Sequence, residues 1–286
     1  MENKTILITG TTNGLGKQLS YLLAKDNQLI LLGRNESLLK ALKEELIKES
    51  NNPSIDYAVC DYSNIDSVYQ TVDTIKKKYE VIDVIIHNAG ALLKPNGNKV
   101  HPALMVNYIS PLLLNELLLD LLLKSNSPIL FYTSTMAIPK SISFDILDNM
   151  KDDSRIKSYG LSKLAFNLYL TSINNKTISI KVFDPKIVYT NAVKTMIPKY
   201  IRWISPLVLL FSRTPKNVAK NALKVLDKNN VNHIDYYVLT KLKPNKKLLR
   251  HISKTDDVIR YAKKELNITN NTYKKWENEY GKDNQK

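Results

Sequence analysis

The stretch Thr5-Ile-Leu-Ile-Thr-Gly-Thr-Thr-Asn-Gly-Leu-Gly16 decides the fold of this chain. It begins with a β-branched, apolar run that is typical of a buried strand. Gly10, Gly14 and Gly16 then fall within seven residues, although the whole chain has only eight glycines. Leucines at helical spacing follow over 17–26, so the stretch predicts a strand, a glycine turn and a helix.

This arrangement suits a phosphate-binding loop. Glycine lets the backbone turn tightly and approach a pyrophosphate, and the helix N-terminus offers free N–H groups and a positive dipole end. The spacing Gly-x-x-x-Gly-x-Gly differs from the common Gly-x-Gly-x-x-Gly pattern of dinucleotide-binding proteins. A turn that binds no ligand is the alternative interpretation.

Strand and helix patterns continue to alternate through residue 190. Apolar strand patterns occupy 28–32, 55–59, 81–86, 128–133 and 177–183, and helical patterns occupy 36–49, 64–78, 104–123 and 157–173. The alternation predicts an α/β fold with a Rossmann-type doubly wound parallel sheet, which binds ligands at the carboxyl ends of its strands. Polar residues follow these strands: the glycine loop, Arg34, Asp61, Asn88, Ser134 and Asp184.

Length and composition fit one large domain. The 286 residues are 43% hydrophobic and 24% charged, as in globular proteins. We expect a single domain over 1–286, with a cofactor-binding and catalytic core at 1–190 and a substrate lid with C-terminal helices at 191–286. Cys60 is the only cysteine, and neither a signal peptide nor an apolar run of 18 residues is evident. A cytoplasmic location is therefore expected.

Positive charge is concentrated in the C-terminal third. Residues 1–190 carry 21 Lys and Arg against 19 Asp and Glu, whereas residues 191–286 carry 21 against 8. Such a balance suggests an anionic partner or a solvated basic surface. The apolar segment 198–211 has basic flanks, so it predicts either a lid over an apolar substrate or a peripheral contact with anionic lipid. Clustered basic and aromatic residues of a nucleic-acid-binding protein are not evident, and we expect no nucleic-acid partner.

Two further features bear on chemistry. Arg34 follows the second strand, where an acidic residue would bind the ribose 2′-hydroxyl of NAD, whereas an arginine accommodates a 2′-phosphate. Arg34 therefore favours NADP(H), with an ordinary surface arginine as the alternative.

Tyr159 and Lys163 lie four residues apart in an expected amphipathic helix, so their side chains share one face. Taken alone, such a pair is more often solvated surface.

In this order the motifs resemble those of the short-chain dehydrogenase/reductase family, in its single-domain branch. The matching pieces are Thr9-Gly-Thr-Thr-Asn-Gly-Leu-Gly16, Asp61, Asn88-Ala89-Gly90, Asn107, Ser134, Tyr159-Gly-Leu-Ser-Lys163 and Pro185-Lys-Ile-Val-Tyr-Thr190. They extend over about two-thirds of the chain. The run from Tyr159 to Ala165 most resembles retinol-dehydrogenase-like members, which act on lipophilic carbonyl compounds.

The resemblance implies an NADP(H)-dependent oxidoreductase that interconverts a carbonyl and an alcohol. Tyr159 would be the acid/base, because a nearby lysine ammonium favours the phenolate of a group whose ordinary pKa is about 10. Lys163 would also bind the nicotinamide ribose, Ser134 would hold the substrate oxygen, and Asn107 would position a water that relays protons to Lys163. The implied cofactor-binding residues are Gly10, Thr12, Asn13, Gly14, Leu15, Gly16, Arg34, Asp61, Asn88, Ala89, Gly90, Tyr159, Lys163, Pro185, Val188 and Thr190.

The chain departs from the family pattern at two positions. Lys186 stands where a glycine usually follows the proline, which puts the backbone beside the nicotinamide in doubt, and Ser110 stands where a glycine often follows the helix asparagine. The leucine-rich helix 104–123 could form a homodimer interface, as in many family members, or simply pack on the sheet. A dinucleotide-binding sensor or scaffold without turnover is the alternative function, and the scattered histidines predict no zinc site.

Overall fold

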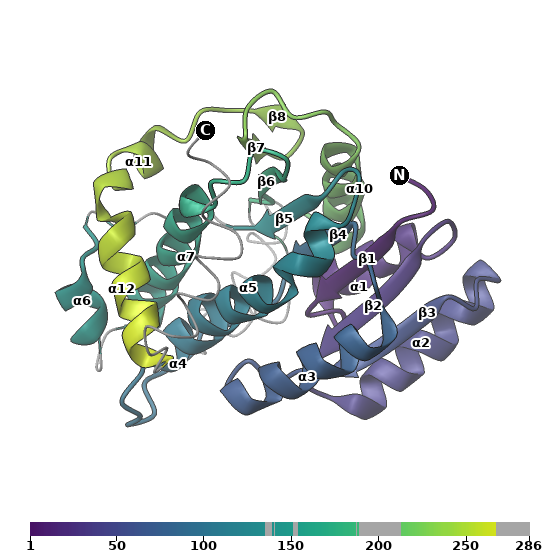
Figure 1. Ribbon diagram of the computed structural model, residues 1–286, viewed down its shortest axis with the longest axis horizontal. Helices are drawn as coiled ribbons and strands as arrows, with labels where there is room; N and C mark the ends of the chain where they lie inside the picture. Colours follow the sequence, from purple (N-terminus) through teal and green to yellow (C-terminus); the bar gives the residue numbers. More distant parts are fainter. Residues whose placement is uncertain (135–138, 140, 151–153, 187, 189–212, 267–286) are drawn as a thin grey trace, which may run out of the picture.

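The computed structural model describes residues 1–134, 139, 141–150, 154–186, 188 and 213–266. Within these residues an 8-stranded sheet has the order β3-β2-β1-β4-β5-β6-β7-β8 (Figure 1), and only the β7–β8 pair is antiparallel. The strands are β1 (Thr5–Thr9), β2 (Gln28–Gly33), β3 (Ile55–Val59), β4 (Val84–His87), β5 (Ile129–Thr133), β6 (Ser179–Asp184), β7 (Ile234–Val238) and β8 (Lys241–Leu242). The predicted α/β doubly wound sheet is confirmed.

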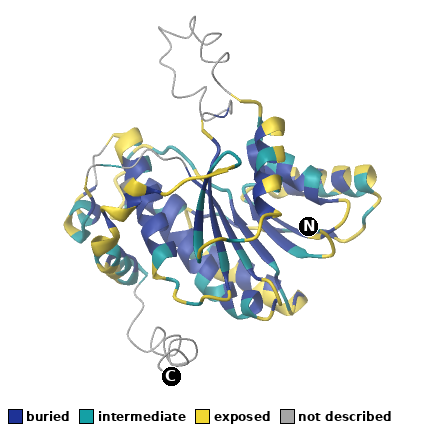
Figure 2. Cartoon of the chain, turned by 90° about the horizontal axis from the view of Figure 1, so that it is seen from above, coloured by how far each residue is buried: buried dark blue, intermediate teal, exposed yellow. Residues whose placement is uncertain are grey.

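Helices cover both faces of the sheet (Figure 2). One face carries α1 (Gly14–Leu23), α2 (Glu36–Ser50) and α10 (Pro215–Leu226), and the other carries α3 (Ile65–Lys78), α4 (Pro102–Leu104), the π-helical turn η1 (Met105–Ile109), α5 (Ser110–Leu123) and α7 (Arg155–Ser172). Beyond α7 lie α6 (Phe144–Asp148), α11 (Lys246–Leu249), the 3₁₀ turn η3 (Ile252–Lys254) and α12 (Thr255–Glu265).

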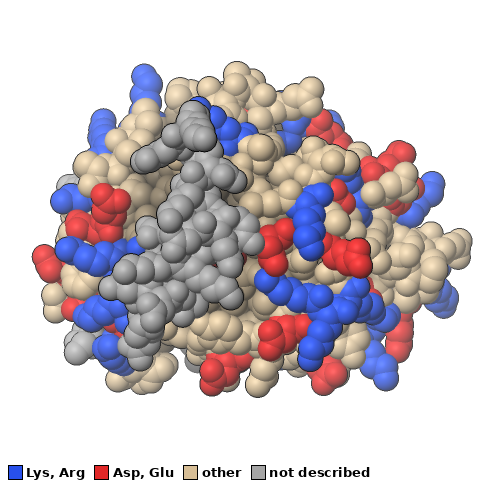
Figure 3. Space-filling model, in the orientation of Figure 1, with Lys and Arg blue, Asp and Glu red and all other residues tan. Residues whose placement is uncertain are grey.

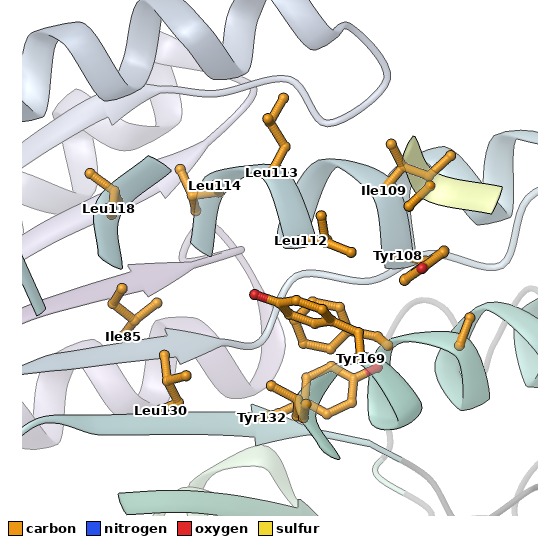
Figure 4. Packing of buried hydrophobic residues seen from close by; sticks show 14 of the residues in the cluster. Ile85, Tyr108, Ile109, Leu112, Leu113, Leu114, Leu118, Leu130, Tyr132 and Tyr169 are labelled. Carbon is orange, nitrogen blue, oxygen red and sulfur yellow. The ribbon is translucent and has the colours of Figure 1, made fainter. Parts of the chain in front are cut away.

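The strands form the two cores because successive side chains point to opposite faces. In β1, Ile6 and Ile8 face the core under α1, α2 and α10, whereas Leu7 faces the core under α3, α5 and α7. Both faces of the central strands are therefore apolar, as the continuous apolar runs of the sequence predict. Figure 4 shows the second core, in which leucines of α5 lie over Ile85 and Leu130 of the sheet.

Most leucines of α5 are buried within this one chain, and Leu117 and Leu123 are partly buried. Ten of its fourteen residues are buried, and the helix packs against α3 and the sheet. Packing inside the chain therefore accounts for most of the leucine-rich pattern. Among the described residues, Pro102–Leu123 is the one helical stretch long and apolar enough to span a membrane, but 72% of its apolar window is buried inside the protein. That burial is typical of a core helix.

Two helices differ from their predicted form. The stretch predicted as one helix over 104–123 contains the π-helical turn η1, because one extra residue is accommodated around Asn107. The predicted amphipathic helix 157–173 is α7, and it is buried on most sides because α12 packs over the face that would otherwise meet solvent. The predicted lid segment 198–211 and the C-terminal residues 267–286 lie outside the described residues.

Candidate functional site

The predicted site residues come together at one edge of the sheet. Because β1 to β7 are parallel, their carboxyl ends share this edge. The glycine loop follows β1, Asn88 follows β4, and Ser134 follows β5, while α7 brings Tyr159 and Lys163 to the same edge.

The glycine loop is closely packed against the segment after β4. Gly10 has a φ of 70° and Gly14 a φ of 59°, a left-handed region that favours glycine. A Cβ at Gly16 would lie 2.3 Å from the carbonyl oxygen of Gly10, so a side chain there would displace the loop. The Asn13 side chain accepts a 2.7 Å hydrogen bond from Gly14 N at the start of α1. A bare backbone at a helix N-terminus fits a dinucleotide pyrophosphate.

Asn88 joins this loop to β4. Its Nδ2 donates to the carbonyl oxygens of Thr9 at 3.1 Å and Gly10 at 3.3 Å, while its backbone N–H donates to Thr9 Oγ1 at 3.0 Å. Ala89 N–H donates to the same Thr9 oxygen at 2.9 Å. The Asn88 side chain therefore holds the phosphate loop in place.

Asn107 holds the next part of the same segment. Its Oδ1 accepts from Ala91 N–H at 2.8 Å, and its Nδ2 donates to Ala91 O at 2.9 Å and to Ser162 Oγ at 3.1 Å. The side chain is 1% exposed. It thus links the loop after β4 to the turn of α7 that carries Lys163, a structural connection that the sequence did not suggest.

Lys163 is buried beside Tyr159. Its ammonium donates to Thr133 O at 3.3 Å, and lies 4.7 Å from the ring centre of Tyr132 and 5.8 Å from that of Tyr159. A Cβ at Gly90 would lie 3.0 Å from Lys163 Nζ, so the absence of a side chain at Gly90 makes room for the ammonium. Burial lowers the pKa of Lys163 to about 7, because desolvation disfavours the charged form.

Ser134 lies at the end of β5 and is 4% exposed. Its backbone N–H donates to Phe183 O at 3.0 Å, and its Oγ accepts from Asn167 Nδ2 at 3.0 Å. Tyr132, two residues earlier, faces the same side of β5, and burial raises the pKa of its hydroxyl well above the ordinary value of 10. Ser134 is therefore held rigidly between the sheet and α7.

Arg34 and Asp61, two of the implied cofactor-binding residues, are less enclosed by the protein. Arg34 is exposed directly after β2. Glu36 Oε1 accepts from Tyr57 Oη at 3.4 Å at the start of α2. Asp61 Oδ1 accepts from the backbone N–H and the hydroxyl of Ser63, at 2.9 and 2.8 Å. One oxygen of Asp61 is therefore used in the turn before α3, whose N-cap is Asn64.

Lys186 adopts the backbone conformation that a glycine would favour. Its φ is 62°, so the chain after Pro185 keeps the left-handed turn although the side chain is a lysine. Asp184 supports the turn, since its Oδ1 accepts from Lys186 N–H at 2.7 Å and its Oδ2 lies 3.6 Å from Lys186 Nζ. Val188 is buried and pairs with Arg213 in an isolated bridge, and Thr190 lies outside the described residues.

The second departure also has a structural explanation. Ser110 is fully buried, and its hydroxyl donates to Tyr62 O at 2.8 Å. The sequence did not single out Tyr132 and Asn167, which lie outside the matching motifs and also support the site. Thr9, Ser162 and Asp184 lie in or beside those motifs, but the supporting contacts that the structure gives them could not be read from the sequence. Among the described residues no group of three His, Cys, Asp or Glu side chains could hold a metal ion.

Comparison with known proteins agrees with this geometry. A family model described as short chain dehydrogenase matches residues 4–146. Human polyprenol dehydrogenase is 28% identical over 209 residues, 67% of this chain and 63% of the human protein. Mouse retinol dehydrogenase 13 is 28% identical over 180 residues, 60% of this chain and 54% of the mouse protein. The matched regions thus span less than two-thirds of each of these two relatives.

Solved structures share the fold. A short chain dehydrogenase of Salmonella enterica superposes with a TM-score of 0.66 at 20% identity, covering 84% of this chain and 97% of the other. One from Escherichia coli CFT073, complexed with NADPH, gives 0.66 at 19% identity over 84% and 98%.

This chain belongs to the short-chain dehydrogenase family, whose members bind a nicotinamide dinucleotide.

Proposed function

We propose that this protein is an NADP(H)-dependent oxidoreductase that interconverts a carbonyl and an alcohol, with Tyr159 as the acid/base. The observation that carries the proposal is the buried Lys163 ammonium, which lies 5.8 Å from the Tyr159 ring, where the absence of a side chain at Gly90 makes room for it. A buried cation beside a phenol favours the phenolate, the form that can accept a proton from an alcohol. The dinucleotide, when bound, would supply or accept the hydride.

The surrounding residues are assigned roles that suit this chemistry. The Ser134 hydroxyl would hold the substrate oxygen by a hydrogen bond, which strengthens as negative charge develops on that oxygen. Lys163 would keep a positive charge near Tyr159 and contact the nicotinamide ribose. Asn107 would position the loop after β4 and Ser162, and a water relay from Asn107 to Lys163 remains part of the proposal.

Tyr159→Phe tests the central assignment. The substitution removes the only proton-donating atom of the side chain and keeps its bulk, so NADPH oxidation with a panel of aldehydes and ketones should fall about 10²–10⁴-fold, the usual contribution of general acid–base catalysis. NADPH binding, followed by nicotinamide fluorescence, should be retained. Undiminished turnover would refute the role of Tyr159.

The alternative is a sensor or scaffold that binds the dinucleotide without turnover. It predicts that the unmodified protein binds NADPH and oxidises none of it with any carbonyl compound in the panel. The joint presence of Ser134, Tyr159, Lys163 and Asn107 at one strand edge favours the enzyme, because binding alone does not require a buried lysine next to a tyrosine.

Arg34 supports the choice of NADP(H). Its exposed guanidinium follows β2 and forms no salt bridge with the described residues, so it is available for a 2′-phosphate. Thermal shift should show stronger stabilisation by NADPH than by NADH. Arg34→Gln should weaken NADPH binding about tenfold or more and leave NADH binding nearly unchanged, because charge-assisted bonds to phosphate are strong. An equal loss for both cofactors would contradict this assignment.

A lipophilic substrate is proposed on the basis of the relatives. Polyprenol and retinol, in the names of the two similar proteins, are long apolar alcohols. Turnover of straight-chain aldehydes should therefore rise with chain length, since each buried CH₂ contributes about 0.8 kcal/mol. The value of kcat/KM should increase from butanal to decanal. A preference for the shortest aldehyde would contradict the proposal.

We also propose a peripheral contact with anionic lipid through α10. Lys216, Lys220 and Lys224 recur every four residues and are exposed, while Val218 and Ala222 of the same helix are buried. By contrast, the face in Figure 3 mixes Lys and Arg with Asp and Glu. Each lysine near an anionic surface contributes about 1 kcal/mol. Co-flotation with phosphatidylserine vesicles at low salt should be lost when all three become glutamine, and absence of co-flotation by the wild type would refute the contact.

A further inference from the structure

The feature that remains unexplained by the family motif is Asn167, a buried amide one turn beyond Lys163 in α7. Its side chain is 3% exposed. Nδ2 donates to Lys163 O at 2.9 Å and to Ser134 Oγ at 3.0 Å. Oδ1 is buried and has no hydrogen-bond partner among the described residues. Both hydrogens of the Asn167 amide are used, one on the Lys163 carbonyl and one on the Ser134 hydroxyl.

The Lys163 carbonyl determines which way the amide points. A backbone carbonyl only accepts hydrogen bonds, so the amino group of Asn167 has to face it. If the Asn167 amide were flipped, its Oδ1 would take the place of Nδ2, 2.9 Å from the Lys163 carbonyl oxygen. Two hydrogen-bond acceptors would then repel each other. The second hydrogen of the same amino group therefore points at Ser134 Oγ, which acts as the acceptor of that bond.

This bond restricts the direction of the Ser134 hydroxyl. A serine hydroxyl has one hydrogen to donate and two lone pairs to accept with. Because one lone pair receives the Asn167 hydrogen, the hydroxyl hydrogen is directed away from α7's amide. Ser134 N–H bonds to Phe183 O at 3.0 Å, so the backbone that carries this hydroxyl is fixed.

We propose that Asn167 is a positioning residue that makes the Ser134 hydroxyl a hydrogen-bond donor toward the substrate oxygen. This inference rests on the proposed function and adds a residue outside the Tyr159–Lys163 motif. In carbonyl reduction the substrate oxygen gains negative charge, and a donated hydrogen bond stabilises that charge more than the neutral carbonyl. Asn167 thereby acts on the barrier through Ser134 without touching the substrate.

The Tyr132 hydroxyl is the competing destination for the Ser134 hydrogen. It lies on the same side of β5 and is buried. If Tyr132 accepted the Ser134 hydrogen during turnover, Tyr132→Phe would change the fold-loss of kcat that an Asn167 substitution causes. Under the proposal, Tyr132→Phe leaves the effect of an Asn167 substitution unchanged.

Asn167→Leu is the first test, because leucine keeps the approximate size and removes the donor. With NADPH and decanal as probes, kcat should fall about 10–100-fold, below the 10²–10³ of a direct oxyanion donor, while KM changes little. In a Ser134→Ala background the same substitution should cause no further loss of kcat, because the hydroxyl through which it acts is absent. Losses that multiply in the double variant would overturn the inference.

Asn167→Asp is the second test, and it is closer in shape to the native residue. An ionised carboxylate only accepts, so it would draw the Ser134 hydrogen toward itself and reverse the bond. Its activity relative to wild type should therefore be lowest at high pH and recover as the pH falls and the carboxyl becomes a donor. A ratio to wild type that stays constant across pH would contradict this reversal.

Asn115→Leu is the matched control. Asn115 is another fully buried amide, and its Nδ2 donates to Tyr169 Oη of α7 at 2.6 Å, away from Ser134. It should lower the thermal unfolding temperature as much as Asn167→Leu but leave kcat within about twofold of wild type. An equal drop of kcat in Asn115→Leu and Asn167→Leu would assign the effect to packing and contradict the inference.

An inactive wild type would overturn the proposed function itself, whereas an active wild type with unaffected Asn167 variants would overturn only this inference.

Discussion

Two regions of this molecule each bury a lysine, and they satisfy its ammonium differently. In the β5–α7 region, Lys163 is 3% exposed and has a single hydrogen-bond acceptor among the described residues, the carbonyl oxygen of Thr133. In the β6–α10 region, Lys181 is 1% exposed and donates to the carbonyl oxygens of Leu226 and Lys228 at the end of α10.

The difference distinguishes the lysine that we propose to be catalytic from a structural one. Lys181 binds the carbonyl groups that a helix end leaves unpaired, and its positive charge complements the helix dipole. Lys163 instead lies over the Tyr132 ring and beside Gly90, with a single carbonyl acceptor among the described residues, so part of its hydrogen-bonding capacity stays available. Burial alone thus does not distinguish the two lysines, whereas the smaller number of acceptors around Lys163 among the described residues does.

Lys163→Met gives the largest expected effect. Methionine matches the length and apolar stem of lysine but removes the charge beside Tyr159, so kcat should fall about 10²–10⁴-fold. The free energy of unfolding should stay the same or increase, because a poorly paired buried ammonium is no longer desolvated. Steady-state NADPH oxidation and chemical denaturation measure the two quantities, and strong destabilisation would mean that Lys163 is mainly structural.

Lys181→Met should give the opposite pattern. It leaves two carbonyl oxygens at the end of α10 without their charged donor, so the free energy of unfolding should fall by about 3 kcal/mol. That corresponds to roughly 6–9 °C in Tm for a domain of this size. At a temperature where the variant is folded, kcat should remain within about twofold of wild type. A selective loss of kcat would place Lys181 in the catalytic machinery.

The pH dependence of stability should sharpen the same comparison. Burial lowers the pKa to about 7 for Lys163 and to about 8 for Lys181, from 10.5 for both in the unfolded chain. Above each lowered pKa the unfolded chain binds more protons than the folded one, so each group makes the free energy of unfolding rise with pH up to about 10.5.

Relative to wild type, Lys163→Met should therefore be most stable at low pH and lose this advantage as the pH rises above 7. Lys181→Met, which is already less stable than wild type, should fall further behind it as the pH rises above 8. Guanidinium unfolding of the three proteins across about pH 6 to pH 10 tests both windows. A difference from wild type that does not vary with pH would show that burial does not shift these pKa values.

Lys186 should give the smallest effect, because its backbone matters more than its charge. Lys186→Gly relieves a left-handed conformation that costs about 1 kcal/mol, while the greater freedom of glycine in the unfolded chain costs about 0.5–1 kcal/mol. The free energy of unfolding should then change by less than about 1 kcal/mol. Lys186→Ala keeps the strain, loses the Asp184 ion pair and should be the less stable of the two variants.

Much of the sheet could be predicted because both its faces are buried. Continuous apolar runs at β1, β2 and β4, broken by glycine and polar turns, leave few alternatives to a parallel α/β arrangement. The glycine loop and the Tyr159–Lys163 pair were accessible for a similar reason, since their spacing within one turn or one helix is set by local geometry.

The supporting contacts could not be predicted, because they join residues far apart in the sequence. Asn107 meets Ser162 across 55 positions, and Asn167 meets Ser134 across 33. The interruption of the predicted helix 104–123 left no mark in the leucine pattern, because the extra residue of η1 lies before the leucine-rich part. The left-handed backbone at Lys186 and its support by Asp184 also could not be predicted from the sequence.

The cover that α12 provides for α7 has a consequence during synthesis of the chain. Helix α7 is complete at Ser172, whereas α12 ends at Glu265, and Tyr108 Oη donates to Val258 O across 150 positions. At about 5–20 residues per second, a ribosome would leave the apolar outer side of α7 uncovered for on the order of 5–20 s. The nascent chain therefore passes through an interval in which chaperones have a defined hydrophobic target, and a ribosome that stalls before α12 would release an aggregation-prone fragment.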